Sequence, residues 1–215
     1  MERILALDHW AWRGGRPRST ASTLDMGRLV HGSDWARLPQ SLRRRFEAGH
    51  GPAVYRGAMS FETSVIGAIF AVLARAFGAP LTGRREANVP VDVDVRAVGD
   101  GVAWARRLDD GHCIRSVKSA GPGGTVLERT DGGLGMVLYV SIEDEALVFT
   151  SRSFFLEVGR WRVTIPGVLT PGRCRVEHRA IDDGWFRFSL TMIHPLWGTT
   201  FRQTGIFTDS QEQAP

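Results

Sequence analysis

Apolar and polar residues alternate along much of the chain beyond residue 90. The run Val91-Asp92-Val93-Asp94-Val95 changes character at every step, and so does Phe186-Arg187-Phe188-Ser189-Leu190. A period of two is typical of a β-strand that buries one face. The pattern predicts strands at Ala53–Phe61, Val91–Val98, Val102–Leu108, Cys113–Val117, Val126–Thr130, Met136–Ile142, Ala146–Ser151, Arg160–Ile165, Arg173–Ile181, Trp185–His194 and Thr199–Phe207. The chain is therefore expected to be mainly β (α+β).

Short turns rich in glycine and aspartate separate several of these segments. Gly99-Asp100-Gly101, Asp109-Asp110-Gly111 and Asp182-Asp183-Gly184 supply residues that tolerate the positive φ of tight hairpins. Consecutive hairpins form an antiparallel meander, and no alternation of strands with helices indicates a parallel sheet. The stretch Ile165–Gly172, with two prolines, predicts a longer loop at one rim.

One helix with almost no charge is predicted at Ser64–Phe77. Thr63 or Ser64 can cap its first N–H groups, and Gly78 and Pro80 follow its end. A helix that is apolar all round is expected to be buried on most sides. We therefore expect a curved antiparallel meander sheet or a partly open barrel, calyx-like and wrapped on this apolar helix.

The N-terminal quarter has a different composition. Leu24–Gly49 predicts two short helices, the second opening at Pro39, and the run Arg43-Arg44-Arg45 is expected on a solvated face. Residues 1–23 show no periodicity and are rich in Gly, Arg and Ser, so we expect a disordered basic arm, with Met26 as an alternative start of translation. Residues 24–210 are then expected to form a single β-rich domain.

The charge distribution argues against nucleic acid as a partner. The net charge is +4, but residues 1–56 hold 10 Arg and 5 acidic residues, whereas residues 57–215 hold 17 basic and 18 acidic ones. The β part is thus almost neutral, and nucleic-acid binding needs a basic stripe on a folded surface.

Cysteine content and hydropathy bear on the compartment. Cys113 and Cys174 are too few for a disulfide framework. The longest largely apolar stretch, Val65–Phe77, is shorter than the roughly 20 residues of a membrane helix, and no secretory signal is recognised. We expect a cytoplasmic protein without membrane insertion.

The hairpin Val102–Val117 carries the most specific candidate site. A three-residue loop, Asp109–Gly111, pairs Leu108 with His112, Arg106 with Ile114 and Trp104 with Ser116, which places these side chains on one face. A two-residue loop would instead set Arg106 opposite Arg115. An inward arginine needs an acidic partner, and Glu128 is the nearest in sequence. Such a pair can orient the polar head of a ligand, or it can be a structural ion pair that closes the barrel end.

Two aromatic residues complete the candidate ligand site. Phe70 lies on the apolar helix, and Trp197 lies in the turn Pro195–Gly198, where Trp161 and Trp185 could join it at a mouth. The predicted ligand-binding residues are Trp104, Arg106, Ser116, Glu128, Phe70 and Trp197.

Other chemistry finds little support in the sequence. The histidines at 112, 178 and 194 lack the i, i+2 spacing of metal ligands on one strand. No G-x-S-x-G motif is present, and the glycine-rich runs open no helix. We expect no metal, no cofactor and no catalytic residue.

Several short motifs, spaced along the chain, form one recognisable set. They are Met26-Gly27-Arg28-Leu29-Val30, Leu38-Pro39, Leu42-Arg43-Arg44-Arg45-Phe46, Val54-Tyr55-Arg56-Gly57, Trp104-Ala105-Arg106, Ile114-Arg115-Ser116, Leu127-Glu128-Arg129, Ile165-Pro166, Leu169-Thr170-Pro171, Pro195-Leu196-Trp197-Gly198 and Gly205. Together they resemble a bacterial family known as domain of unknown function 4166, over residues 24–208. Two positions depart from its pattern: an aromatic is usual at Leu108, and a tyrosine is usual shortly before Gly205, where Gln203 and Thr204 stand.

The resemblance implies a link to reductases. Members of that family occur alone or on the C-terminal side of short-chain or saccharopine-dehydrogenase-like reductases, which implies handling of a reductase's substrate or product. No G-x-G-x-x-G follows a strand in this chain, so no attached reductase is expected.

Three functions stay open. The first is a non-enzymatic binder of a small apolar or amphipathic molecule inside a β calyx. The second is a small barrel enzyme, a cyclase, isomerase or hydrolase, with Glu128 as acid or base. The third is a docking module for a separately encoded reductase, through an exposed sheet edge. We expect the first.

Overall fold

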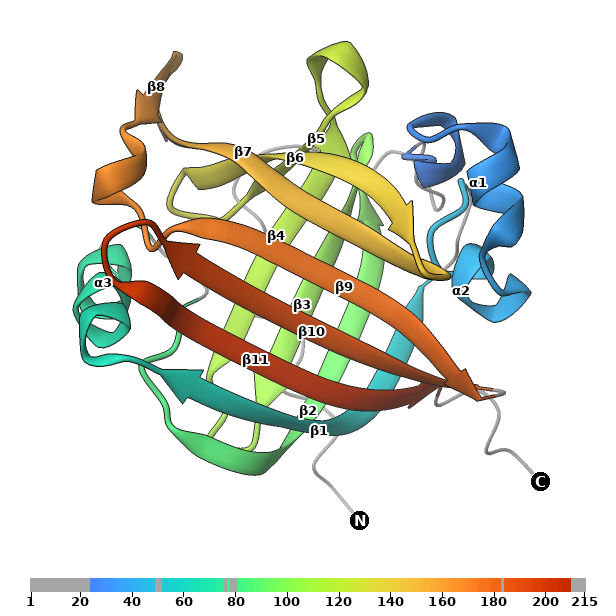
Figure 1. Cartoon of the computed structure of the whole chain (residues 1–215), viewed down its shortest axis with the longest axis horizontal. Coiled ribbons are helices and arrows are strands. Elements are labelled where there is room, and N and C mark those ends of the chain that lie inside the picture. The colour runs from blue at the N-terminus through green and yellow to red at the C-terminus, as the bar shows by residue number, and fades with distance from the viewer. Residues whose placement is uncertain (1–23, 49–51, 76, 78–80, 183, 210–215) are drawn as a thin grey trace.

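The alternating segments form the strands of a closed barrel. The computed structural model describes residues 24–48, 52–75, 77, 81–182 and 184–209. One antiparallel sheet holds the strands in the order β6-β5-β4-β3-β2-β1-β11-β10-β9-β7-β8, and a further pairing of β6 with β7 closes ten of them into a ring (Figure 1). The strand β8, at the end of this order, pairs with β7 alone and lies outside the ring.

Every predicted strand is present. The strands are β1 (Ala53–Thr63), β2 (Glu86–Val98), β3 (Gly101–Leu108), β4 (Cys113–Ala120), β5 (Val126–Arg129), β6 (Leu134–Glu143), β7 (Ala146–Val158), β8 (Trp161–Ile165), β9 (Arg173–Asp182), β10 (Trp185–His194) and β11 (Gly198–Asp209). Positive φ at Gly99, Gly111 and Gly184 confirms the predicted turn chemistry. The predicted rim loop contains a short 3-10 helix, Gly167–Leu169.

The expected partly open sheet around a helix is wrong. Because β6 pairs with β7 and β1 pairs with β11, the sheet closes on itself. Buried side chains from the strands, such as Phe149, Phe201 and Phe207, form the core of the barrel. The apolar helix α3 (Val65–Arg75) lies instead at one end of the barrel (Figure 1). Ser64 caps it, since its Oγ accepts from Gly67 N at 3.0 Å.

Much of α3 is exposed at that end. Only Gly67 and Ala71 are buried, whereas Val65, Ile69, Val72 and Leu73 are exposed. A Cβ on Gly67 would come within 2.2 Å of the carbonyl oxygen of Thr200, so glycine permits the close approach of α3 to β11.

Short helices close the opposite end. They are a 3-10 turn (Met26–Arg28), α1 (Gly32–Arg37) and α2 (Gln40–Arg44), which confirms the predicted pair (Figure 1). Leu38, Leu42 and Phe46 are buried in the core. The prediction of a solvated arginine face is wrong at Arg45, which is buried with its guanidinium 4.1 Å from the Phe186 ring centroid. The expected arm at residues 1–23 lies outside the described residues.

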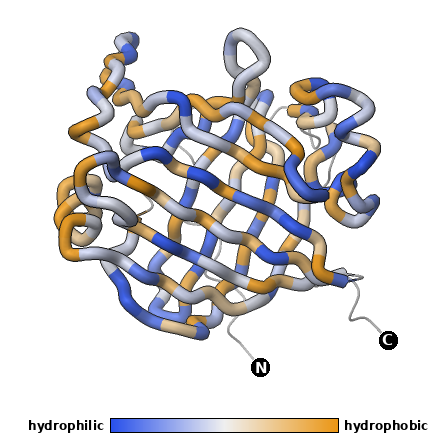
Figure 2. Tube along the Cα trace, in the orientation of Figure 1, coloured by the Kyte–Doolittle hydropathy of each residue, from blue (hydrophilic) through white to orange (hydrophobic). Residues whose placement is uncertain are grey.

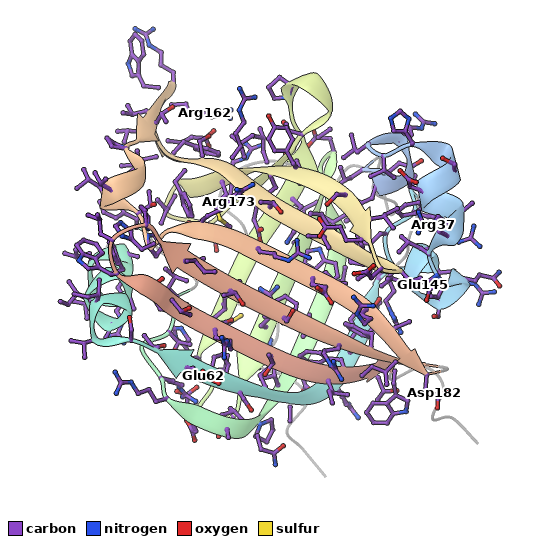
Figure 3. All side chains as sticks on the ribbon, viewed as in Figure 1. Arg37, Glu62, Glu145, Arg162, Arg173 and Asp182 are labelled. Atoms are coloured by element: carbon purple, nitrogen blue, oxygen red, sulfur yellow. The ribbon has the colours of Figure 1, made fainter. Side chains whose placement is uncertain are left out.

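The barrel wall separates a largely apolar interior from a charged exterior. Figure 2 shows hydrophobic and hydrophilic positions alternating along the strands, and the charged side chains labelled in Figure 3, such as Glu62 and Arg162, are exposed. Within the described residues, no helix combines the length and apolarity that a membrane span requires.

Candidate functional site

The β3–β4 hairpin has the predicted register. Arg106 faces Ile114 and Trp104 faces Ser116, and the Leu108 N–H donates to the His112 carbonyl at 2.9 Å. The same register places Val102 opposite Lys118. Lys118 therefore shares the inward face with Ser116, because side chains two positions apart in a strand point the same way.

Glu128 is the acidic centre of the barrel interior. Its Oε1 accepts a hydrogen bond from the Ser116 Oγ at 2.6 Å and from the Lys118 Nζ at 2.8 Å, and all three side chains are buried. The expected partner of this carboxylate was Arg106, but no ion pair within 4.0 Å joins these two described residues. Lys118, the single lysine of the chain, has taken that place.

Electrostatics favour the ionised form of Glu128. Burial alone would raise its pKa, but the charge of Lys118, the hydrogen bonds from Lys118 and Ser116, and the charge of Arg106 together lower the pKa below its usual range. Burial and Arg106 also lower the pKa of Lys118, which favours the neutral amine. We assign both as charged, because one oxygen accepts two short hydrogen bonds.

Arg106 occupies the same interior without a polar partner. Its guanidinium lies 5.0 Å from the Phe188 ring centroid, and it makes no hydrogen bond or ion pair with any described residue. Burial lowers the pKa of Arg106, and the nearby charge of Glu128 opposes that shift. The Arg106 side chain is half-buried and lines a cavity inside the barrel.

Two hollows lie one after the other toward the α3 end. The first, about 40 Å³, is lined by Arg106, Lys118, Glu128 and Gln203 and by apolar residues. The second, about 160 Å³, is largely apolar. Its lining comes from α3, the strand ends and the rim loop, and includes Phe70, Leu73, Ala74, Phe77, Leu134, Phe154, Ile165, Leu169 and Pro171.

These two hollows adjoin. Leu81, Glu128, Met136 and Met192 line both of them. The arrangement is therefore a single interior space with charged groups at its inner end and apolar walls toward α3.

Trp104 lies beyond the inner end of this space. Its ring stacks on Phe46 with centroids 5.8 Å apart and on Tyr55 at 6.4 Å. It lines neither of the two hollows, but Lys118 Nζ is 5.6 Å from its centroid. His178 belongs to the same aromatic layer, 4.9 Å from Phe46, and burial with nearby positive charge lowers its pKa far below the usual value.

The aromatic residues expected at the rim, Phe70, Trp197 and Trp185, do not lie together. Phe70 lines the larger hollow and contacts Trp197, with centroids 5.9 Å apart. Trp197 stacks on His194 at 4.1 Å and is itself outside the lining. Trp185 begins β10 whereas Trp197 follows its end, so Trp185 does not join Trp197 at one mouth. Of the predicted residues, the structure thus brings Arg106, Ser116, Glu128 and Phe70 to the interior space.

Another hollow lies apart from the predicted residues. It has a volume of about 410 Å³, between α3, residues 81–84 and the turn after β3, and its lining mixes exposed charges such as Arg75 and Asp110 with small apolar side chains. Arg84 is paired with Asp109 and Asp110 there. In the described part of the chain, no three His, Cys, Asp or Glu side chains gather as a metal site would require.

Several residues that line the interior space were not predicted from the sequence. Lys118 was detectable, because extending the β3–β4 register by two residues reaches it. Met136 was detectable too, because it faces Glu128 across the β5–β6 pair. Met192 and Gln203 carried no signal of their own, since β10 and β11 join this lining only through pairings between strands far apart in sequence.

Comparison with known proteins assigns the chain to a family. A family model described as a domain of unknown function (DUF4166) matches residues 38–207, from the end of α1 through the barrel to β11. No curated protein matches. The matched region holds every charged group and lining residue of the interior space, and it spans most of the chain. The protein therefore belongs to the family of the domain of unknown function DUF4166.

Proposed function

We propose that the protein binds a small apolar or amphipathic molecule inside the barrel and performs no chemistry on it. The observation that carries the proposal is the interior space itself, apolar toward α3 and charged at its inner end. A ligand site of this kind typically has mostly apolar walls and a few convergent polar groups.

The size of the space limits the ligand. A cavity of about 150 Å³ holds a benzene-sized molecule, so the 160 Å³ hollow fits an apolar group of roughly six to eight carbons. Longer ligands would extend past Phe70 and Leu169, at the rim.

A pair of phenylalanine substitutions on α3 tests this proposal. Ala74→Phe places a ring in the larger hollow, whereas Val72→Phe adds the same ring at an exposed position outside it. We expect octanoate or octan-1-ol to raise the Tm of the native protein and of Val72→Phe by several degrees, because a ligand that binds only the folded state stabilises it. Ala74→Phe should show no shift. The absence of any shift in the native protein, with no small molecule co-purifying in native mass spectrometry, would overturn the proposal.

Catalysis by Glu128 has less support. A general acid needs a pKa near the working pH, whereas the pKa of Glu128 is lowered and its Oε1 is already engaged by two donors. Should a substrate be found, unchanged turnover in Glu128→Gln would exclude this residue as the acid or base.

Docking on a reductase is the second candidate, favoured by one feature. The strand β8 has a single neighbour and exposes Trp161 and Val163, and an unpaired strand edge is a ready site for another chain. We expect a reductase co-expressed with this protein to co-elute with it and to separate from the variant Trp161→Ser. Independent elution of the native pair would remove this candidate.

A further inference from the structure

Two polar side chains that line the innermost part of the cavity have no hydrogen-bond partner among the described residues. The side chain of Arg106 makes no hydrogen bond or ion pair with a described residue. Gln203 lines the same 40 Å³ hollow and is buried, and its side-chain amide likewise has no hydrogen bond to a described residue. Polar groups shielded from bulk water are nearly always hydrogen-bonded. A buried Gln203 and a half-buried Arg106 that line one small cavity therefore indicate a missing partner.

The charge of the cluster indicates the sign of that partner. Lys118 and Glu128 neutralise each other through their 2.8 Å contact, which leaves the charge of Arg106 in excess. The neighbouring titratable groups add no negative charge, because burial raises the pKa of the Cys174 thiol and lowers that of His178. An uncompensated buried cation is costly, and an anion would remove that cost.

The cavity sizes indicate the shape of that anion. A hollow of 40 Å³ has room for about three water molecules or for one small group such as a carboxylate. It adjoins the larger apolar hollow at Met136 and Met192. An anion held at Arg106 would therefore carry an apolar tail toward α3.

We propose that the ligand is an apolar monocarboxylate, whose carboxylate pairs with Arg106 and accepts from the Gln203 amide while its hydrocarbon part fills the hollow below α3. This inference rests on the proposed binding function. A guanidinium can bond both oxygens of a carboxylate, and such charge-assisted bonds are stronger than neutral ones. Ordered water on Arg106 is the alternative occupant, and it predicts no preference for an anion.

Three eight-carbon probes that differ in the head group alone test the proposal. Octanoate, octan-1-ol and octylamine are titrated calorimetrically into the full chain at pH 7.5, together with Arg106→Met, Gln203→Leu and Arg107→Met. The last is the matched control, because Arg107 is the next residue of β3 and is exposed. We expect octanoate to bind the native protein and Arg107→Met about tenfold or more tightly than octan-1-ol, and octylamine to bind weakest.

The variants separate the roles of the two donors. Arg106→Met should bind octanoate and octan-1-ol equally, while Gln203→Leu should reduce the preference for octanoate about threefold to tenfold. If Arg106→Met does not fold, the head-group ranking in the native protein and the Gln203→Leu titration still decide. Equal binding of octanoate and octan-1-ol by the native protein, or preference for octylamine, would overturn the carboxylate assignment and leave the binding function intact. If none of the three probes binds, both fail.

Discussion

The Lys118 Nζ lies 2.8 Å from Oε1 of Glu128, and the barrel buries both side chains. The pair joins neighbouring strands, since Lys118 faces Glu128 in the β4–β5 register. A third charge, Arg106, lies nearby without an ion pair to any described residue. The charges of these three described residues therefore leave this part of the interior positive on balance.

Removing one member of this pair should be costly. Glu128→Gln leaves the Lys118 ammonium buried beside Arg106, and breaking a buried pair in this way typically costs about 3–5 kcal/mol. We expect a loss of that size in the free energy of unfolding, measured by urea denaturation. Asp94→Asn is the control, because it breaks the exposed Arg96–Asp94 contact and should cost less than about 1 kcal/mol. The double variant Lys118→Met with Glu128→Leu should recover most of the loss. A Glu128→Gln protein as stable as the native one would contradict the assignment of a charged pair.

The acid stability of the protein should depend on His178. In the folded protein its pKa is far below the usual 6.5, because of burial and then of the positive charges on Lys118, Arg106 and Arg45. Below pH 6.5 the unfolded chain binds a proton at this residue and the folded chain does not, so stability falls as the pH falls. The predicted loss between pH 7 and 5.5 is about 1 kcal/mol.

The variant His178→Phe should remove this part of the pH dependence, whatever its effect on stability at pH 7. The exposed His112→Gln serves as the control, and urea denaturation at several pH values between 7 and 5.5 provides the measurement. An unchanged slope in His178→Phe would show that another group causes the loss. Below that window Glu128 adds a further loss, because its lowered pKa means that stability present above about pH 4.3 disappears as the pH falls through the folded value.

Local patterns predicted the strands and one register well. The Asp109–Gly111 loop and the repulsion that a two-residue loop would create between Arg106 and Arg115 were enough to pair Trp104 with Ser116. These features act between residues close in sequence. The same register, followed to the end of β4 at Ala120, would also have revealed Lys118.

Closure of the sheet could not be predicted in this way. It depends on the pairing of Gly57 with Phe207 and of Met136 with Phe154, and alternation does not encode the partners of a strand. The position of α3 could not be predicted either, because an apolar pattern alone does not distinguish a helix inside the barrel from one at its end, where α3 lies. The position of Trp104 beyond the inner end of the cavity could not be predicted either, because it depends on Phe46, far earlier in the chain, which stacks on the Trp104 ring.

The methyl groups of the methionines report directly on whether the interior space takes up a ligand. Met136 and Met192 line both hollows, whereas Met26 is buried at the opposite end. In protein labelled with ¹³C at the methionine methyls, a titration with octanoate should shift the signals of Met136 and Met192 saturably and leave that of Met26 in place. Signals that stay unmoved at Met136 and Met192, or that move no more than that of Met26, would contradict binding inside the barrel.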